Sequence, residues 1–224
     1  HLIDRGARPS DVAVVYPVVD LAEWSQPSTL RQELQLGQDD IVVGCVAVMR
    51  AQKGHRALID AMEPLLRRRA RLHLVFVGGG SPTFEQVQAH VAAKGLGGQI
   101  HLLGARKDVP NLLAGFDMFA LATEQEASGT VFVEAANAGL AVVGTDVDGV
   151  PEMMKNGVTG LLVPLHDRAA LTAALEKLID DPGLRARMGE AGRRMVRTEG
   201  KFSQEAMVRN IESCYYRWLS ELKK

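Results

Sequence analysis

The stretch from Thr123 to Asn137, near the middle of the chain, carries the clearest chemistry in the sequence. It places one carboxylate, Glu126, in a loop and a second, Glu134, one turn into an expected helix that begins near Gly129. Free backbone N–H groups at a helix N-terminus bind anions, and a glycine allows a ligand to approach the backbone closely. The stretch therefore predicts a site for a nucleotide diphosphate with a polar group attached at each end.

The two carboxylates have different expected partners in this site. The amides of Gly129, Thr130 and Val131, which follow Ser128, would face phosphate, and Glu134 would accept the hydroxyls of an attached ribose, as acidic residues do in dinucleotide-binding folds. Glu126 would face the opposite end of the diphosphate, where a sugar would sit. A glycosidase would use the same two carboxylates as an acid/base pair. A helix N-terminus, however, favours an ionised carboxylate or a bound phosphate over an acid of raised pKa.

Two cations, Arg50 and Lys53, precede Gly54 and an expected helix that starts near His55. Such cations can bind a diphosphate and stabilise the negative charge that develops on a leaving phosphate. The alternative is that both are ordinary exposed surface cations. His55 itself is interpreted mainly as a first-turn helix residue.

Other nucleotide and metal motifs find little support. The triplet Gly78–Gly80 lacks the Gly-x-Gly-x-x-Gly spacing and follows the second core strand, and the chain has no Walker motif, which argues against a nicotinamide dehydrogenase or a P-loop enzyme. The histidines show no metal-ligand spacing. Asp146 and Asp148 resemble a metal-chelating Asp-x-Asp, but we interpret them as part of a polar loop before a helix at Pro151.

The elements that must position these residues alternate along the chain. Apolar runs predict strands at 41–48, 72–77, 100–103, 118–121, 140–143 and 160–164, and helical patterns lie at about 55–69, 83–95, 108–115, 130–139 and 149–155. This alternation predicts right-handed crossovers and an α/β fold with a doubly wound parallel, Rossmann-like sheet. Ligands bind such sheets beyond the carboxyl ends of the strands. The candidate residues follow the first four core strands, so we expect their loops to converge on one site.

Extra helices are expected after the sheet, at 167–178, from Pro182 with Asp181 as its cap, and at about 203–222. The last of these carries Tyr215, Tyr216 and Trp218 near its end. Two interpretations are open for these aromatic side chains. They could dock onto the domain's own surface, or they could contact a neighbour that is missing from this chain.

The composition indicates an ordinary globular protein. In 224 residues, 46% are hydrophobic and the net charge is −1, which gives no general attraction to nucleic acid or an anionic membrane. The basic run Arg67–Arg71 is interpreted as helix-end cations, with a membrane-surface contact as the alternative. Cys45 and Cys214 lie far apart and predict buried thiols in a reducing compartment. No signal peptide and no membrane-spanning run is recognised, which favours a cytoplasmic location.

The chain opens with His1, and Leu2–Gly6 is typical of a helix end, so we interpret the sequence as a piece of something longer. As an ordered set, several segments resemble the C-terminal, donor-binding domain of the family 4 (group 1) retaining glycosyltransferases, which have the two-domain GT-B fold. The segments that carry the resemblance are Val15–Trp24, Val46–His55, Leu103–Leu113, the Glu-x7-Glu pair Glu126 and Glu134, and Gly149–Pro164.

The resemblance implies a division of the chain and a set of roles. Residues 1–24 would be an interdomain segment and residues 25–224 the nucleotide-sugar-binding domain, with the N-terminal acceptor domain absent. Catalytic roles fall on Arg50, Lys53 and Glu126, and donor binding falls on Gly79, Gly80, Arg106, Ser128, Gly129, Thr130, Val131 and Glu134. The loop around Arg106 would recognise the base through its backbone.

Two departures from the family pattern limit what the resemblance implies. Val48 stands where the family usually has an arginine, so Arg50 is the expected substitute. Ser128 replaces an aromatic residue of the family's motif, and donor preference therefore does not transfer.

The implied activity is transfer of a sugar from a donor such as a UDP- or GDP-sugar, with retained anomeric configuration and without a metal or other cofactor. The acceptor, a sugar or a lipid-linked sugar, would bind the missing N-terminal domain, so the isolated chain is expected to be inactive. The setting would be assembly of bacterial surface polysaccharide or lipopolysaccharide, at the inner face of the membrane, with peripheral membrane association of the full-length protein. The alternatives are a nucleotide-sugar epimerase of GT-B fold and a non-catalytic nucleotide-binding module.

Overall fold

The computed structural model describes residues 5–19 and 26–222. Its six strands form one parallel sheet in the order β3-β2-β1-β4-β5-β6. Their bounds are β1 Ile41–Val46, β2 Leu72–Val77, β3 Ile100–Leu102, β4 Met118–Leu121, β5 Ala141–Thr145 and β6 Gly160–Val163. The α/β doubly wound sheet expected from the sequence is confirmed. Strand addition reverses direction between β1 and β4, which is the position where folds of this kind bind ligands.

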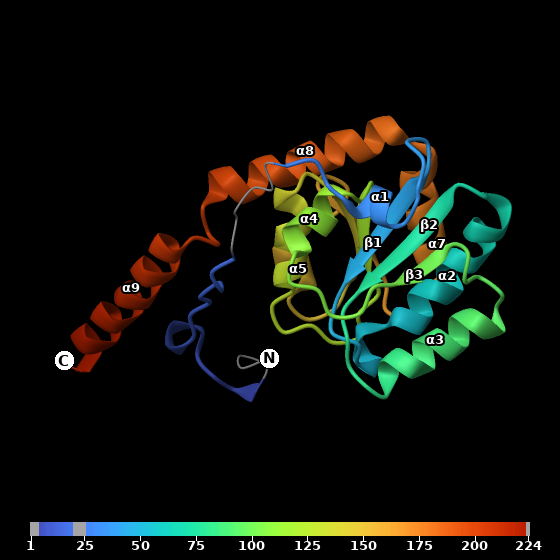
Figure 1. Cartoon of the computed structure of the whole chain (residues 1–224). Coiled ribbons are helices and arrows are strands. Elements are labelled where there is room, and N and C mark those ends of the chain that lie inside the picture. Colours follow the sequence, from blue (N-terminus) through green and yellow to red (C-terminus); the bar gives the residue numbers. More distant parts are fainter. Residues whose placement is uncertain (1–4, 20–25, 223–224) are drawn as a thin grey trace.

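Helices cover both faces of the sheet (Figure 1). One face carries α2 (His55–Arg68), α3 (Thr83–Ala93) and α7 (Arg168–Asp180), and the other carries α4 (Val109–Ala114), α5 (Thr130–Asn137) and α8 (Pro182–Glu199). The shorter pieces are α1 (Leu30–Glu33), α6 (Val150–Met153) and the 3-10 turns Pro9–Asp11 and Ala51–Lys53. Among these, α1 and the two 3-10 turns are not predicted from the sequence, and α6 is shorter than the helix expected at 149–155.

The core lies where the continuous apolar runs place it. Every residue of β2 is buried, as are the four central residues of β1, which is the pattern of strands covered on both faces. Phe119 of β4 and Phe132 of α5 pack edge to face, with ring centroids 5.5 Å apart. This contact fixes α5, which carries the candidate phosphate-binding amides, against the central strand β4.

The C-terminal helix α9 (Gln204–Leu222) extends away from the rest of the molecule (Figure 1). Its aromatic side chains are not docked onto the domain's own surface, because Tyr216 is 73% exposed, Tyr215 61% and Trp218 39%. That interpretation is wrong, and contact with a neighbour beyond this chain stays a prediction. Within the described residues, no helix combines the length and apolar character needed to cross a membrane.

Some sequence-based expectations concern residues outside the described ranges, and the expectation for the two cysteines is only partly confirmed. The helix end expected at Leu2–Gly6 lies largely outside the described residues, as does Trp24 of the interdomain segment. Cys45 is buried, and its burial raises the pKa of the thiol, but Cys214 is only partly buried, so the expectation of two buried thiols holds for Cys45 alone.

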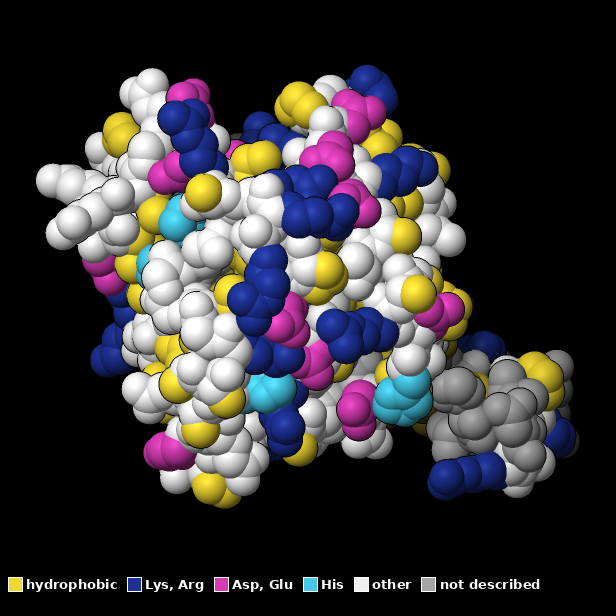
Figure 2. Space-filling view, turned by 90° about the vertical axis from the view of Figure 1, so that its right-hand side faces the viewer, with side chains coloured by type: hydrophobic (Ala, Val, Ile, Leu, Met, Phe, Trp, Pro, Cys, Tyr) yellow, Lys and Arg dark blue, Asp and Glu magenta, His cyan; other side chains and the backbone are white. Residues whose placement is uncertain are grey.

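The basic run at the end of α2 is engaged by acidic partners and helix carbonyls. Arg68 donates from Nε to the Pro64 carbonyl at 2.9 Å, and Arg68 and Arg69 each lie 3.0 Å from the Glu176 carboxylate. Figure 2 shows a face on which cationic and anionic side chains are interspersed. These contacts support the interpretation as helix-end cations.

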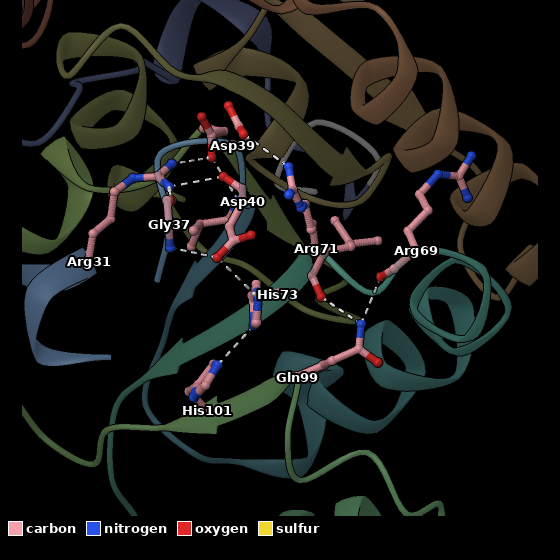
Figure 3. A network of polar contacts seen from close by, with 12 residues as sticks. Arg31, Gly37, Asp39, Asp40, Arg69, Arg71, His73, Gln99 and His101 are labelled. Carbon is pink, nitrogen blue, oxygen red and sulfur yellow. Dashed lines mark hydrogen bonds and ion pairs between the residues drawn. The ribbon is translucent and has the colours of Figure 1, made fainter. Parts of the chain in front are cut away.

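A polar network occupies the amino ends of the strands, at the opposite edge from the candidate site (Figure 3). His73 Nδ1 lies 3.2 Å from His101 Nε2, and His73 Nε2 lies 3.8 Å from Asp40 Oδ2. Burial lowers the pKa of both imidazoles. Over the ranges that the structure describes, no three or more His, Cys, Asp or Glu side chains are grouped so as to hold a metal ion.

Candidate functional site

The loops that follow β1, β2, β3 and β4 lie side by side at the carboxyl edge of the sheet. Backbone hydrogen bonds join them: Met49 N–H to the Gly79 carbonyl (2.9 Å), Gly78 N–H to the Gly104 carbonyl (2.8 Å) and Glu124 N–H to the Gln52 carbonyl (2.7 Å). The convergence of loops expected from the strand order is therefore present, and it forms one continuous rim.

Gly54 sets how closely the loop after β1 approaches β4. Its φ is +64°, and a Cβ at this position would lie 1.8 Å from the Ala122 carbonyl oxygen. Thr123, which is fully buried, donates from its hydroxyl to the Gln52 carbonyl at 3.1 Å. These contacts hold Lys53, at the end of the 3-10 turn, next to the loop that carries Glu126.

A pocket of about 180 Å³ opens between these loops and the start of α5. It is lined by Val46, Ala47, Val48, Lys53, Leu121, Glu126, Gly129, Thr130 and Val131. Inside it, Lys53 Nζ lies 2.5 Å from Glu126 Oε2, and the two side chains are only 17% and 12% exposed. The lysine and carboxylate that the sequence assigns to one site thus form a partly buried ion pair.

The N-terminus of α5 supplies the other polar wall of this pocket. Gly129 caps the helix without a side-chain hydrogen bond, and its N–H donates to Glu126 Oε1 at 3.2 Å. The next amides, of Thr130 and Val131, belong to the first turn, where backbone N–H groups have no partner within the helix. Together with the helix dipole, these amides make this side of the pocket favourable for an anion.

Three predicted residues lie on the same rim but outside the lining of this pocket. Arg50 is exposed and immediately precedes the 3-10 turn Ala51–Lys53. Gly79 and Gly80 belong to the loop that is hydrogen-bonded to Met49.

Arg106 is held by acidic neighbours. Its guanidinium lies 2.7 Å from Glu33 Oε1 and 2.8 Å from Asp108 Oδ1. Hydrogen bonding to Arg106 lowers the pKa of the Asp108 carboxyl, and the same contact raises the pKa of Arg106. The side chain thus fixes the loop to α1 and α4, an arrangement compatible with recognition of a base through the backbone.

Ser128 and Glu134 are both half-buried, before and within α5, and neither lines the pocket. The structure therefore brings together Lys53, Glu126 and the range 129–131 in one pocket, and the remaining candidates lie outside its lining. Their individual roles stay predictions.

The sequence places His55 in the first turn of a helix and Asp148 in a polar loop, as the structure confirms, but it does not reveal the surroundings of either residue. His55 is only 2% exposed, lies beside the Phe76 ring with centroids 5.4 Å apart, and has no hydrogen-bond partner of ordinary geometry at either ring nitrogen. Burial lowers the pKa of its imidazole to about 4. Asp148 accepts a hydrogen bond from Glu126 N–H at 3.0 Å. The sequence placed Asp148 in a polar loop, but nothing in its local pattern indicated this partner.

A larger cavity, of about 230 Å³, lies on the other side of the loop after β4. Its lining comes from α2, from Glu124 and from the segment between β6 and α7, including His166 and Arg168. It contains none of the residues that the sequence analysis assigned to donor binding. We therefore place the candidate site in the smaller pocket, where the predicted residues meet.

Comparison with known proteins gives a consistent result. The sequence model of the family described as "Glycosyl transferases group 1" matches residues 27–195. The chain is 27% identical over 208 residues to N-acetyl-alpha-D-glucosaminyl L-malate synthase of Bacillus anthracis, covering 92% of this chain and 54% of that protein. It is 30% identical over 180 residues to the lipopolysaccharide core biosynthesis glycosyltransferase LpsE of Rhizobium meliloti, covering 80% of this chain and 50% of that protein. The chain thus spans about half the length of the curated relatives it matches.

Solved structures share the fold. Anabaena HepE in complex with UDP and glucose superposes with a TM-score of 0.83 at 25% identity, over 96% of this chain and 59% of that chain. The C-terminal domain of LpcC, a group 1 family protein of Francisella tularensis, superposes with a TM-score of 0.71 at 23% identity, over 85% of this chain and 97% of that chain. The second likeness concerns the fold alone.

Proposed function

The chain belongs to the group 1 glycosyltransferases, and from this premise we propose that it is the donor-binding part of an enzyme that transfers a sugar from a nucleoside diphosphate to an acceptor, with retained anomeric configuration. The observation that carries the proposal is the pocket in which Lys53, Glu126 and the N-terminus of α5 meet at the carboxyl edge of the sheet. Family membership favours a transferase over an epimerase or a non-catalytic module.

The pocket supplies the positive charge that this reaction needs. When the bond between the sugar and the diphosphate breaks, negative charge builds up on the departing phosphate. Lys53 and the amides of residues 129–131 can stabilise that charge from fixed positions. Arg50, on the adjoining rim, would add a second cation, and we propose that this set acts without a metal ion.

Each part of the donor is assigned to a different loop or helix at the edge of the sheet. Glu134, one turn into α5, would bind the ribose hydroxyls, and the backbone around Arg106 would bind the base. The diphosphate would lie between Gly79–Gly80 and the start of α5, with Glu126 toward the sugar. The structure of HepE with UDP and glucose supports a nucleotide-sugar donor.

The acceptor and its location are further proposals. We infer that residues 1–24 join this domain, residues 25–224, to an N-terminal domain that binds a sugar or lipid-linked acceptor. The named role of LpsE in lipopolysaccharide core biosynthesis supports a function in surface polysaccharide assembly. The enzyme would then work in the cytoplasm, at the inner face of the membrane.

Calorimetric titration of the chain with UDP and GDP tests the proposal. Lys53→Ala should weaken diphosphate binding by about tenfold to a hundredfold, because a hydrogen bond to a charged group contributes about 1.5–3 kcal/mol. Glu134→Ala should weaken binding of UDP more than binding of pyrophosphate, because pyrophosphate has no ribose for Glu134 to bind.

Lys177→Ala is the matched control, because this exposed lysine of α7 lies outside the pocket. It should leave both affinities unchanged. Binding that neither Lys53→Ala nor Glu134→Ala alters would refute the site.

A further inference from the structure

The candidate phosphate pocket already contains an anion that belongs to the protein. The Glu126 carboxylate is held by Lys53 Nζ at 2.5 Å through one oxygen and by Gly129 N–H at 3.2 Å through the other. These two donors, a cation and a helix N-terminal amide, are the groups that would otherwise face a bound phosphate. The carboxylate thus occupies the position that the proposed function gives to the donor's diphosphate.

The backbone of Glu126 is fixed on both sides, so only its side chain is free to leave. Its N–H donates to Asp148 Oδ2 at 3.0 Å, and its carbonyl accepts from Gly149 N–H at 3.1 Å. A Cβ on Gly149 would lie 2.7 Å from the Ala127 carbonyl oxygen, which shows how closely the two loops pack. Rotation of the side chain about its own bonds would therefore release the carboxylate without moving the loop.

The Glu126 carboxylate and a bound phosphate compete for these donors, since Gly129 has a single N–H, although the Lys53 ammonium has three. A carboxylate and a phosphate within a few ångströms of each other repel strongly in a partly buried pocket, where the effective dielectric constant is lower than in water. A diphosphate can gain the Gly129 amide only when Glu126 gives it up, and repulsion between the two anions favours displacement of Glu126 from Lys53 as well. The polar end of Glu126 then becomes available on the side of the pocket where a transferred sugar would lie.

We propose that Glu126 is an internal substitute for phosphate, and that the diphosphate of the donor displaces it from Lys53 and Gly129. The inference rests on the proposed function and adds a regulatory step to the same site. Binding of the diphosphate and release of Glu126 toward the sugar are one coupled event. A nucleoside without phosphate leaves the Lys53–Glu126 pair intact.

The test compares three probes, UDP, inorganic pyrophosphate and uridine, by calorimetry on the wild-type chain and on Glu126→Gln. Glutamine keeps the shape of the side chain but removes the competing charge. We expect Glu126→Gln to bind UDP and pyrophosphate about threefold to tenfold more tightly than the wild type, as loss of a partly buried ion pair of about 1 kcal/mol would give. Uridine binding should not change.

Glu190→Gln is the matched control, because Glu190 is exposed on α8 and lies outside the pocket. It should leave all three affinities unchanged. Circular dichroism of Glu126→Gln checks that the fold is retained, and Glu126→Ala provides a second variant that also removes the charge.

The outcomes separate this inference from the proposed function. If Lys53→Ala weakens UDP binding while Glu126→Gln and Glu126→Ala bind UDP equally or more weakly than the wild type, the internal-substitute role is wrong and the donor site stands. If neither UDP nor pyrophosphate binds the wild type or either Glu126 variant, both the donor site and this role are wrong. Tighter binding of UDP and pyrophosphate, with unchanged uridine binding, supports the displacement.

Discussion

At the scale of single residues, burial determines whether the side chain of His55 carries a charge. His55 lies at the first position of α2, directly after the loop that carries Lys53, yet it faces the Phe76 ring and not solvent. A buried imidazole is unfavourable in its charged form. The side chain is therefore expected to be neutral while the protein is folded.

This burial makes the stability of the protein dependent on pH. The unfolded chain protonates His55 near pH 6.5, whereas the folded protein does so only near pH 4. The contribution of His55 to the stability of the protein is therefore fully present above about pH 6.5. It is lost as the pH falls toward 4, by about 3 kcal/mol at most. His73 and His101, whose pKa values are also lowered, act in the same direction.

Urea unfolding between pH 7 and pH 4.5 checks this expectation. His55→Met should lose less stability over that interval than the wild type, because it has no imidazole to protonate in the unfolded state. His166→Asn, at an exposed position, should follow the wild type. An equal loss for His55→Met and the wild type would contradict the assignment.

At the scale of elements, the site depends on how closely one loop meets the next strand. The loop after β1 approaches the end of β4 only because Gly54 has no side chain to meet Ala122. This contact also holds the backbone of Lys53 near the loop of Glu126. The position of α5 is set separately, by packing of Phe132 on Phe119.

Replacing Gly54 with alanine should therefore disturb both stability and the site. We expect a loss of at least about 2 kcal/mol in the free energy of unfolding, since the new Cβ must move backbone atoms and also adopt a left-handed conformation. Gly95→Ala is a close control, because Gly95 has a φ of +65° but no neighbouring atom lies within 4 Å of the place that its Cβ would take. Chemical denaturation should show a loss of only about 1 kcal/mol for Gly95→Ala, and equal losses for both variants would contradict the packing argument.

Much of this element arrangement follows from the sequence. The strands at 72–77 and 118–121 have the predicted bounds, because each is a mainly apolar run that ends at polar or turn-forming residues. The four-residue helix α1 was missed, since a single turn has no periodicity and is held by distant contacts such as Thr29 N–H to Asn111 Oδ1 at 3.0 Å. For the same reason, the Lys53–Glu126 pair could be assigned to one site but its direct contact could not be predicted.

The whole molecule is a compact sheet domain with one helix that extends beyond it (Figure 1). Most apolar side chains of α9 add little to the stability of this domain: Val208 is 42% exposed, Ile211 36% and Tyr216 73%, and Ala206 near its start is the buried exception among these. The attachment of α9 lies at its start instead. There, Phe202 is 1% exposed and packs edge to face on Tyr16, with ring centroids 5.7 Å apart.

Thermal and urea unfolding should separate these two parts. Tyr216→Ser should change the free energy of unfolding by less than about 0.5 kcal/mol, as expected for an exposed side chain. Phe202→Ala should lower it by about 3–5 kcal/mol, because it leaves a cavity at the junction. A loss of more than about 1 kcal/mol for Tyr216→Ser would show that the α9 aromatics pack on this domain after all.

The central claim is that the start of α5 and Lys53 form a diphosphate site, and backbone amide NMR during titration with UDP tests it most directly. We predict that the amide signals of Gly129, Thr130 and Val131 shift together and saturate, and that Lys53→Ala reduces the shifts at a given UDP concentration. The amide of Ala170, at the N-terminus of α7 and already bonded to Asp167, should not move. Shifts at Ala170 as large as those at residues 129–131, or no shifts at residues 129–131 while UDP binds, would contradict it.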